Sequence, residues 1–156
     1  MIRTYLNKVF TNDMIGISCY RNEMDMIRLG FGMKKIDNQK VIAMYEFHIQ
    51  TDFRLIDNNS IVLCASMIFL DSDGTEFNNT AKNWTKKNLP AKVDSFEVNK
   101  WGDLIINLQD DKCIQVYNAY QDSEERELWR VMEVGSDKKH VVINNHSMRN
   151  LMFKNN

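Results

Sequence analysis

The fold is decided by the stretch Val41-Ile42-Ala43-Met44-Tyr45-Glu46-Phe47-His48-Ile49-Gln50, which shows the clearest two-residue alternation in the chain. Its apolar face carries Val41, Ala43, Tyr45, Phe47 and Ile49. Its other face becomes polar toward the end, at Glu46, His48 and Gln50. Because successive side chains of a β-strand point to opposite sides, this pattern predicts a strand with one buried face.

Similar segments lie on both sides of this strand. Before it, helical spacing of apolar residues predicts a short helix over residues 2–10, followed by strands over 14–20 and 24–31. After it, the patterns predict strands over residues 53–56, 61–69, 93–98, 102–108, 112–118, 127–134 and 139–143. The polar segment 76–88 predicts a loop or a further short helix, which Pro90 closes.

Short polar turns connect these segments. Asn58-Asn59 and the run Gln109-Asp110-Asp111 tolerate the left-handed backbone that tight hairpins need. Parallel pairing would instead require crossovers of about a dozen residues or more, and only the segment 76–88 is long enough for one. We therefore expect an α+β fold that is mainly an antiparallel β-sheet of hairpins, or two packed sheets, in a single domain over residues 1–156.

Composition narrows the classes of function. Of the 156 residues, 44% are hydrophobic and 26% are charged, and the formal net charge is −1. Lysine and arginine are scattered rather than gathered in a basic stripe, so we expect no nucleic-acid partner. The apolar runs are shorter than the roughly 20 residues that cross a bilayer, and the first residues lack a secretion-signal pattern. We expect a cytoplasmic protein with no membrane partner.

A search for chemical motifs finds none that meets the spacing its chemistry needs. Three widely spaced cysteines fit neither a disulfide framework nor a zinc knuckle, and three histidines lack metal-binding spacing. Asp71-Ser72-Asp73-Gly74 lacks the positions of a calcium loop, and Gly30-Phe31-Gly32 lacks the third glycine of a dinucleotide loop. We therefore predict no cofactor, no metal and no catalytic residue, which favours a binding protein over an enzyme.

The candidate binding residues are polar, acidic or aromatic side chains on predicted strand faces and in one loop. The acidic run 122–125 would attract a basic partner, and tryptophan and arginine are common at binding hot spots. On a strand Trp129 and Arg130 face opposite sides, so either one anchors the core while the other is exposed. The full set is His48, Gln50, Arg54, Asp122, Glu124, Glu125, Trp129 and Arg130.

The order of these patterns resembles a family of small uncharacterised bacterial β-rich proteins. The segments that carry the resemblance are residues 24–32, 45–50, 53–55, 102–106, 114–116, 127–130 and 140–142. They are strand patterns rather than catalytic signatures, and the segment 76–88 has no counterpart. Proteins of this kind include immunity proteins, so the resemblance implies a non-enzymatic inhibitor that neutralises a cognate bacterial toxin or another enzyme.

Two alternatives stay open at this point. One is a small ligand-binding domain or enzyme with a cleft around His48, Arg54 and Trp129, because small-molecule sites gather a few polar groups in a concave pocket. The other is a structural homodimer. The sequence does not decide whether those three side chains converge in space.

Overall fold

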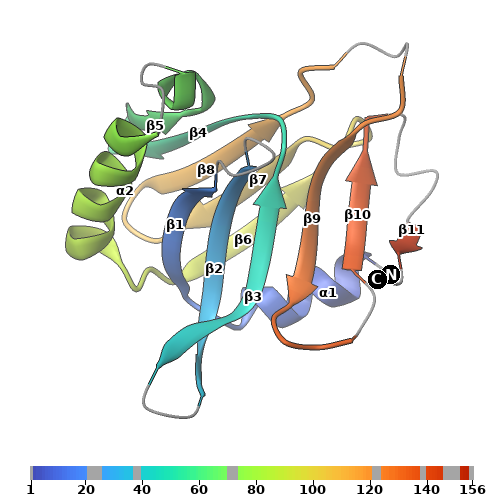
Figure 1. The fold of residues 1–156 in the computed structure, drawn as a ribbon, viewed down its shortest axis with the longest axis horizontal. Helices are drawn as coiled ribbons and strands as arrows, with labels where there is room; N and C mark the ends of the chain where they lie inside the picture. The colour runs from blue at the N-terminus through green and yellow to red at the C-terminus, as the bar shows by residue number, and fades with distance from the viewer. Residues whose placement is uncertain are drawn as a thin grey trace.

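A computed structural model describes residues 2–20, 26–36, 40–69, 74–120, 124–137, 140–145 and 152–154, with side chains for all of these except 20, 69 and 152–154. Within these ranges the chain forms two antiparallel β-sheets that lie face to face, with two α-helices beside them (Figure 1). No helix in the described ranges is long and apolar enough to cross a membrane. The predicted α+β class with mainly antiparallel strands is confirmed.

The first sheet contains the strand that opened the analysis. Its order is β1 (Met14–Tyr20), β2 (Met26–Lys35), β3 (Val41–Ile49), β9 (Glu127–Glu133), β10 (His140–Asn144) and β11 (Met152–Lys154). Every neighbouring pair is antiparallel. In Figure 1 the outer face of this sheet turns toward the viewer, and the second sheet lies behind it.

The second sheet is built from the middle of the chain. Its order is β5 (Ser60–Cys64), β4 (Asp52–Asp57), β8 (Lys112–Tyr117), β7 (Leu104–Leu108) and β6 (Val93–Val98). The chain crosses between the sheets right after β3. The backbone N–H of Gln50 still donates to Leu128 of the first sheet, whereas the hydroxyl of Thr51 donates to the carbonyl of Tyr117 in the second.

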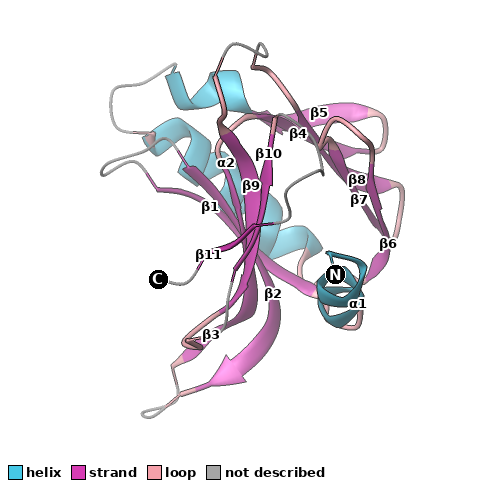
Figure 2. Ribbon diagram, turned by 90° about the vertical axis from the view of Figure 1, so that its right-hand side faces the viewer, coloured by secondary structure: helices cyan, strands magenta, loops and turns pink. Residues whose placement is uncertain are grey.

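The two α-helices cover two margins of this sandwich. Helix α2 (Thr75–Asn88) lies beside β1 and buries Phe77, Ala81 and Trp84 (Figure 1). The indole N–H of Trp84 donates to Oδ2 of Asp57, 2.8 Å away, which connects the helix to β4. Helix α1 (Ile2–Phe10) buries Leu6 and Val9 and lies beside β6, the last strand of the second sheet (Figure 2).

One contiguous apolar core fills the space between the sheets. Its centre is aromatic: the ring of Phe47 lies 5.4 Å from Phe31, 5.6 Å from Phe96 and 5.7 Å from Trp129, centroid to centroid. Complete burial of one large apolar side chain stabilises a fold by about 1.5–3 kcal/mol. The predicted alternation of β3 is confirmed from Tyr45 onward, because Tyr45, Phe47 and Ile49 are buried, but Val41 at the start of the predicted apolar face is exposed.

Both predicted tight turns form. Asn58 and Asn59 have φ of 48° and 63°, and Asp110 and Asp111 have φ of 60° and 54°. These left-handed residues match the twist of two-residue hairpin loops. Across the second turn, Ile106 pairs with Ile114 and Leu104 with Val116.

Three predictions of elements need correction or completion. The expected strand 61–69 is wrong in its second half, because β5 ends at Cys64 and a 3₁₀ helix, η2 (Ala65–Phe69), follows. A short apolar run does not distinguish a strand from a helical turn by periodicity alone. The segment 76–88 forms a helix rather than a loop, and β11 was not expected. The start of the strand predicted over 24–31 lies outside the described residues.

Candidate binding surface

The outer face of the first sheet carries a row of charged side chains from three neighbouring strands. In the strand register, Arg28 of β2 pairs with His48 of β3, and His48 pairs with Arg130 of β9. Because Phe47 and Ile49 on either side of His48 and Trp129 and Val131 on either side of Arg130 fill the core, these side chains are directed away from it. We call Arg28, Glu46, His48, Glu127 and Arg130 the charged row.

A hydrogen bond and an ion pair join neighbouring members of the charged row. Nε2 of His48 lies 2.9 Å from Oε2 of Glu46, and the guanidinium of Arg130 contacts both carboxylate oxygens of Glu127, at 2.5 and 2.6 Å. The amide of Gln50 donates to the same Glu127, 3.1 Å away. A two-point arginine–carboxylate contact fixes geometry as well as charge. The predicted residues His48, Gln50 and Arg130 are therefore brought together.

Electrostatics in this row follow from these contacts. The pKa of Glu46 lies below its ordinary value, chiefly because His48 donates a hydrogen bond to it; partial burial opposes this shift, and the charges of His48 and Arg28 add to it. Beside the row, His140 is only 5% exposed, and its Nδ1 has no hydrogen-bond partner among the described residues. Burial lowers the pKa of His140, the charges of Arg130 and His48 lower it further, and Glu127 opposes them.

The acidic segment before β9 is held by two asparagines at the end of β10. The side chain of Asn145 donates to the carbonyl of Glu124, 2.8 Å away, and accepts from the backbone N–H of Arg126 at 2.9 Å. The amide of Asn144 donates to the carboxylate of Glu125. Glu124 also pairs with Arg126 at 2.8 Å. Glu124 and Glu125 are both exposed, whereas the predicted residue Asp122 lies outside the described residues.

An exposed tryptophan beside this segment was not predicted as a site residue. Trp101 is 57% exposed, in the turn between β6 and β7. Oδ1 of Asn99 accepts from the backbone N–H groups of Trp101, at 2.9 Å, and Asp103, at 3.1 Å. The amide of Asn118 reaches the carbonyls of both Trp101 and Asn145. The available signal was a tryptophan between turn-forming Asn99 and Gly102, where core packing is not expected.

The expected cleft around His48, Arg54 and Trp129 does not form. Trp129 is completely buried, and its indole N–H donates to the carbonyl of Gly102, 2.7 Å away. Arg54 belongs to β4, where it donates to Gln115 at 2.8 Å and lies over the ring of Tyr117 at 4.8 Å. Its neighbours on β4, Phe53 and Leu55, point into the core, so Arg54 lies on the outer face of the second sheet. Side chains on the two opposite outer faces of the sandwich, such as His48 and Arg54, cannot meet at one point with a side chain buried between the sheets.

The candidate residues form two groups, the charged row and the group of Trp101, Glu124, Glu125 and Arg126, which together we call the binding surface. Within the second group, hydrogen bonds through Asn118 and Asn145 connect the turn of Trp101 to the segment of Glu124. In the part of the chain that the structure describes, no group of three or more His, Cys, Asp or Glu side chains is arranged to hold a metal ion. No protein-family model, no curated protein and no solved structure matches the chain.

Proposed function

We propose that this chain is a non-enzymatic, protein-binding inhibitor that acts through the binding surface. The observation that carries the proposal is the exposure of Trp101 on a turn held by hydrogen bonds. A tryptophan side chain offers about 150–250 Å² of area for burial. An isolated exposed apolar residue is ordinary, but the ammonium of Lys100 lies over the ring of this one, 4.2 Å from its centroid, and hydrogen bonds connect its turn to the segment of Arg126. Tryptophan and arginine are enriched at binding hot spots.

Rigidity of the turn supports this role. Asn99 holds the backbone on both sides of Gly102, and the carbonyl of Gly102 accepts from the buried indole of Trp129. Side chains that are already positioned lose less conformational entropy when a partner binds. Trp101 is thus prepared for insertion into a pocket of another protein.

The charges on the binding surface indicate the chemistry of the partner. Glu124 and Glu125 are exposed on the segment that hydrogen bonds through Asn118 and Asn145 connect to the turn of Trp101, and Asn144 and Asn145 hold this segment in place. Exposed acidic groups speed association with a basic surface and disfavour acidic ones. The favoured partner is an enzyme whose active-site rim is basic and carries an apolar pocket.

Resemblance to immunity proteins gives the finer form of the proposal, in which the partner is a cognate bacterial toxin. Segments that carry this resemblance form parts of strands in both sheets, including β2, β3 and β9, the strands of the charged row. An inhibitor of this kind requires shape and charge complementarity rather than a fixed catalytic geometry. That requirement agrees with a sequence in which no catalytic spacing is found.

The experiment is a quantitative co-purification from the native organism with three forms of the full chain. Wild type should retain one stoichiometric protein, and Trp101→Ala should lose it. Ile61→Ala is the matched control, because Ile61 is also 57% exposed but lies on β5 in the second sheet. The purified partner is then assayed for an enzymatic activity that wild type suppresses. Absence of a stoichiometric partner, or equal retention by all three forms, would contradict the proposal.

A further inference from the structure

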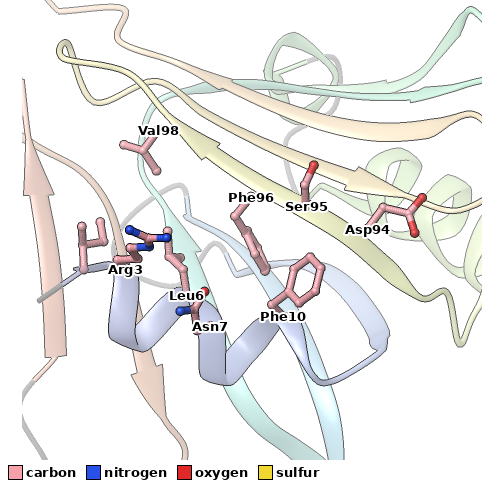
Figure 3. A pocket seen from close by; sticks show the side chains of 9 residues that line it. Arg3, Leu6, Asn7, Phe10, Asp94, Ser95, Phe96 and Val98 are labelled. Carbon is pink, nitrogen blue, oxygen red and sulfur yellow. The ribbon is translucent and has the colours of Figure 1, made fainter.

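A second candidate surface lies between helix α1 and strand β6, and Trp101, Glu124 and Glu125 do not line it. There the structure contains a cavity of about 490 Å³ that opens to solvent. Its apolar walls come from Leu6 and Phe10 of the helix and from Phe96 and Val98 of the strand (Figure 3). The rings of Phe10 and Phe96, 6.3 Å apart, join the two elements at one end of the cavity.

Strand β6 presents an open edge to this cavity. It is the last strand of the second sheet, and among the described residues no strand pairs with its outer side. The backbone N–H of Asn99 donates to the carbonyl of Asp103, which shows which residues of β6 form hydrogen-bonded pairs with β7 and which do not. In an antiparallel ladder only alternate residues bond to the partner strand, so the backbone groups of Phe96 and Val98 are directed outward. These are the two strand residues that form the apolar wall.

Charges of opposite sign mark the two ends of the cavity. Arg3 lies at the start of α1, near Val98, whereas Asp94 lies at the other end, beyond Phe96 (Figure 3). Both side chains are exposed. A ligand that runs along the cavity would therefore place an acidic group beside Arg3, apolar side chains in the middle and a basic group beside Asp94.

We infer that the cavity between α1 and β6 is a docking site for an extended segment of another protein, which adds to the second sheet as a strand beside β6. Open edge groups supply main-chain hydrogen bonds, and alternate side chains of the segment enter the apolar cavity, as in other cases of strand addition beside a helix. Antiparallel pairing is the more stable arrangement per residue. The segment then runs from an acidic residue at Arg3 to a basic residue at Asp94.

The proposal concerns a different set of side chains from the proposed inhibitory function. Trp101 and the acidic residues Glu124 and Glu125 do not line the cavity. A partner held at the binding surface and a segment held beside β6 are therefore separable by mutation.

The test uses ¹⁵N-labelled full-length chain and the synthetic peptide Ac-Glu-Thr-Val-Thr-Val-Thr-Lys-NH₂. We expect saturable chemical-shift changes confined to α1 and β6. A peptide with its terminal Glu and Lys exchanged should bind about tenfold more weakly, as expected for two partly exposed charge pairs. The double variant Arg3→Glu/Asp94→Lys should prefer the exchanged peptide, and Trp101→Ala should bind the original peptide as wild type does.

Three outcomes would overturn the inference. One is the absence of saturable shift changes with either peptide. A second is a double variant that still prefers the original peptide over the exchanged one. The charges at the two ends of the cavity would then make no contribution to binding. The third is a concentration-dependent dimer, seen by light scattering, with intermolecular contacts at β6, because a second copy of the chain would then occupy the edge.

Discussion

The indole N–H of Trp129 donates a hydrogen bond to the carbonyl oxygen of Gly102, 2.7 Å away. This bond connects the buried centre of the first sheet to the turn that presents Trp101 at the surface. A buried core residue therefore holds the backbone directly next to the proposed binding residue Trp101 through one hydrogen bond.

Replacement of Trp129 by Phe should destabilise the protein strongly. The change leaves a void in the aromatic core and removes the donor to Gly102, and one unsatisfied buried polar group alone costs about 1–3 kcal/mol. Chemical denaturation measures the loss. Trp101→Phe is the control and should change the free energy of unfolding by less than about 0.5 kcal/mol, as surface substitutions usually do. Equal losses in the two variants would contradict the roles assigned to the two residues.

Substitution of Gly102 by Ala should be more harmful than the same change at Gly135. Both glycines have positive φ, 87° and 67°, where a Cβ adds strain. At Gly102 the new Cβ would also lie 2.8 Å from Cδ1 of Leu128, whereas nothing lies within 4 Å at Gly135. We expect an additional loss of about 1–3 kcal/mol at Gly102, from overpacking. Thermal or chemical unfolding of the two variants, side by side, measures the difference.

Acidification should weaken folding through His140. Its pKa in the folded protein lies below the ordinary value of 6.5, chiefly because of burial and then because of Arg130 and His48. As the pH falls through 6.5 the unfolded chain takes up a proton that the folded chain does not, so the free energy of unfolding decreases. His140→Gln should flatten this part of the stability profile between about pH 8 and pH 5. An unchanged slope would show that His140 is not responsible.

The two glutamate–arginine pairs near β9 should differ in strength. Exposed fractions are 10% for Glu127 and 22% for Arg130, but 68% for Glu124 and 55% for Arg126. In double-mutant cycles with Glu→Gln and Arg→Met changes, we expect a coupling of about 1.5–3 kcal/mol for the partly buried pair. The exposed pair should give about 0–1 kcal/mol and should weaken further in salt. Equal coupling energies in the two pairs would mean that burial does not determine the strength of the Glu127–Arg130 ion pair.

Much of the architecture was accessible from local patterns. The helix over residues 2–10 and the strands over 14–20 and 93–98 were predicted with the bounds that the structure has. Residues 65–69 were not, because an apolar run this short satisfies both a strand and a 3₁₀ turn, and contact with α2 and neighbouring strands selects the latter.

The candidate site likewise contains residues that the sequence predicted and residues that it did not. His48 and Arg130 were named from the sequence, and cross-strand pairing brings them side by side. Trp101 was not predicted, although its position between turn-forming Asn99 and Gly102 was a sequence signal for exposure, because the strand pattern drew attention to Trp129 instead. Arg54 was grouped with His48 because they are close along the chain, but the crossing at Gln50-Thr51 places them on different sheets.

By itself, the sequence determined the strand periods, the left-handed turns at Asn58-Asn59 and Asp110-Asp111, and hence an antiparallel fold. These features depend on backbone sterics and on neighbours a few residues away. Only the tertiary structure decided that Trp129 enters the core while Trp101 stays outside, and that Arg54 and His48 are on separate faces. The placement of these side chains depends on how the two sheets pack against each other, and this packing is determined by contacts between residues that are far apart in the chain.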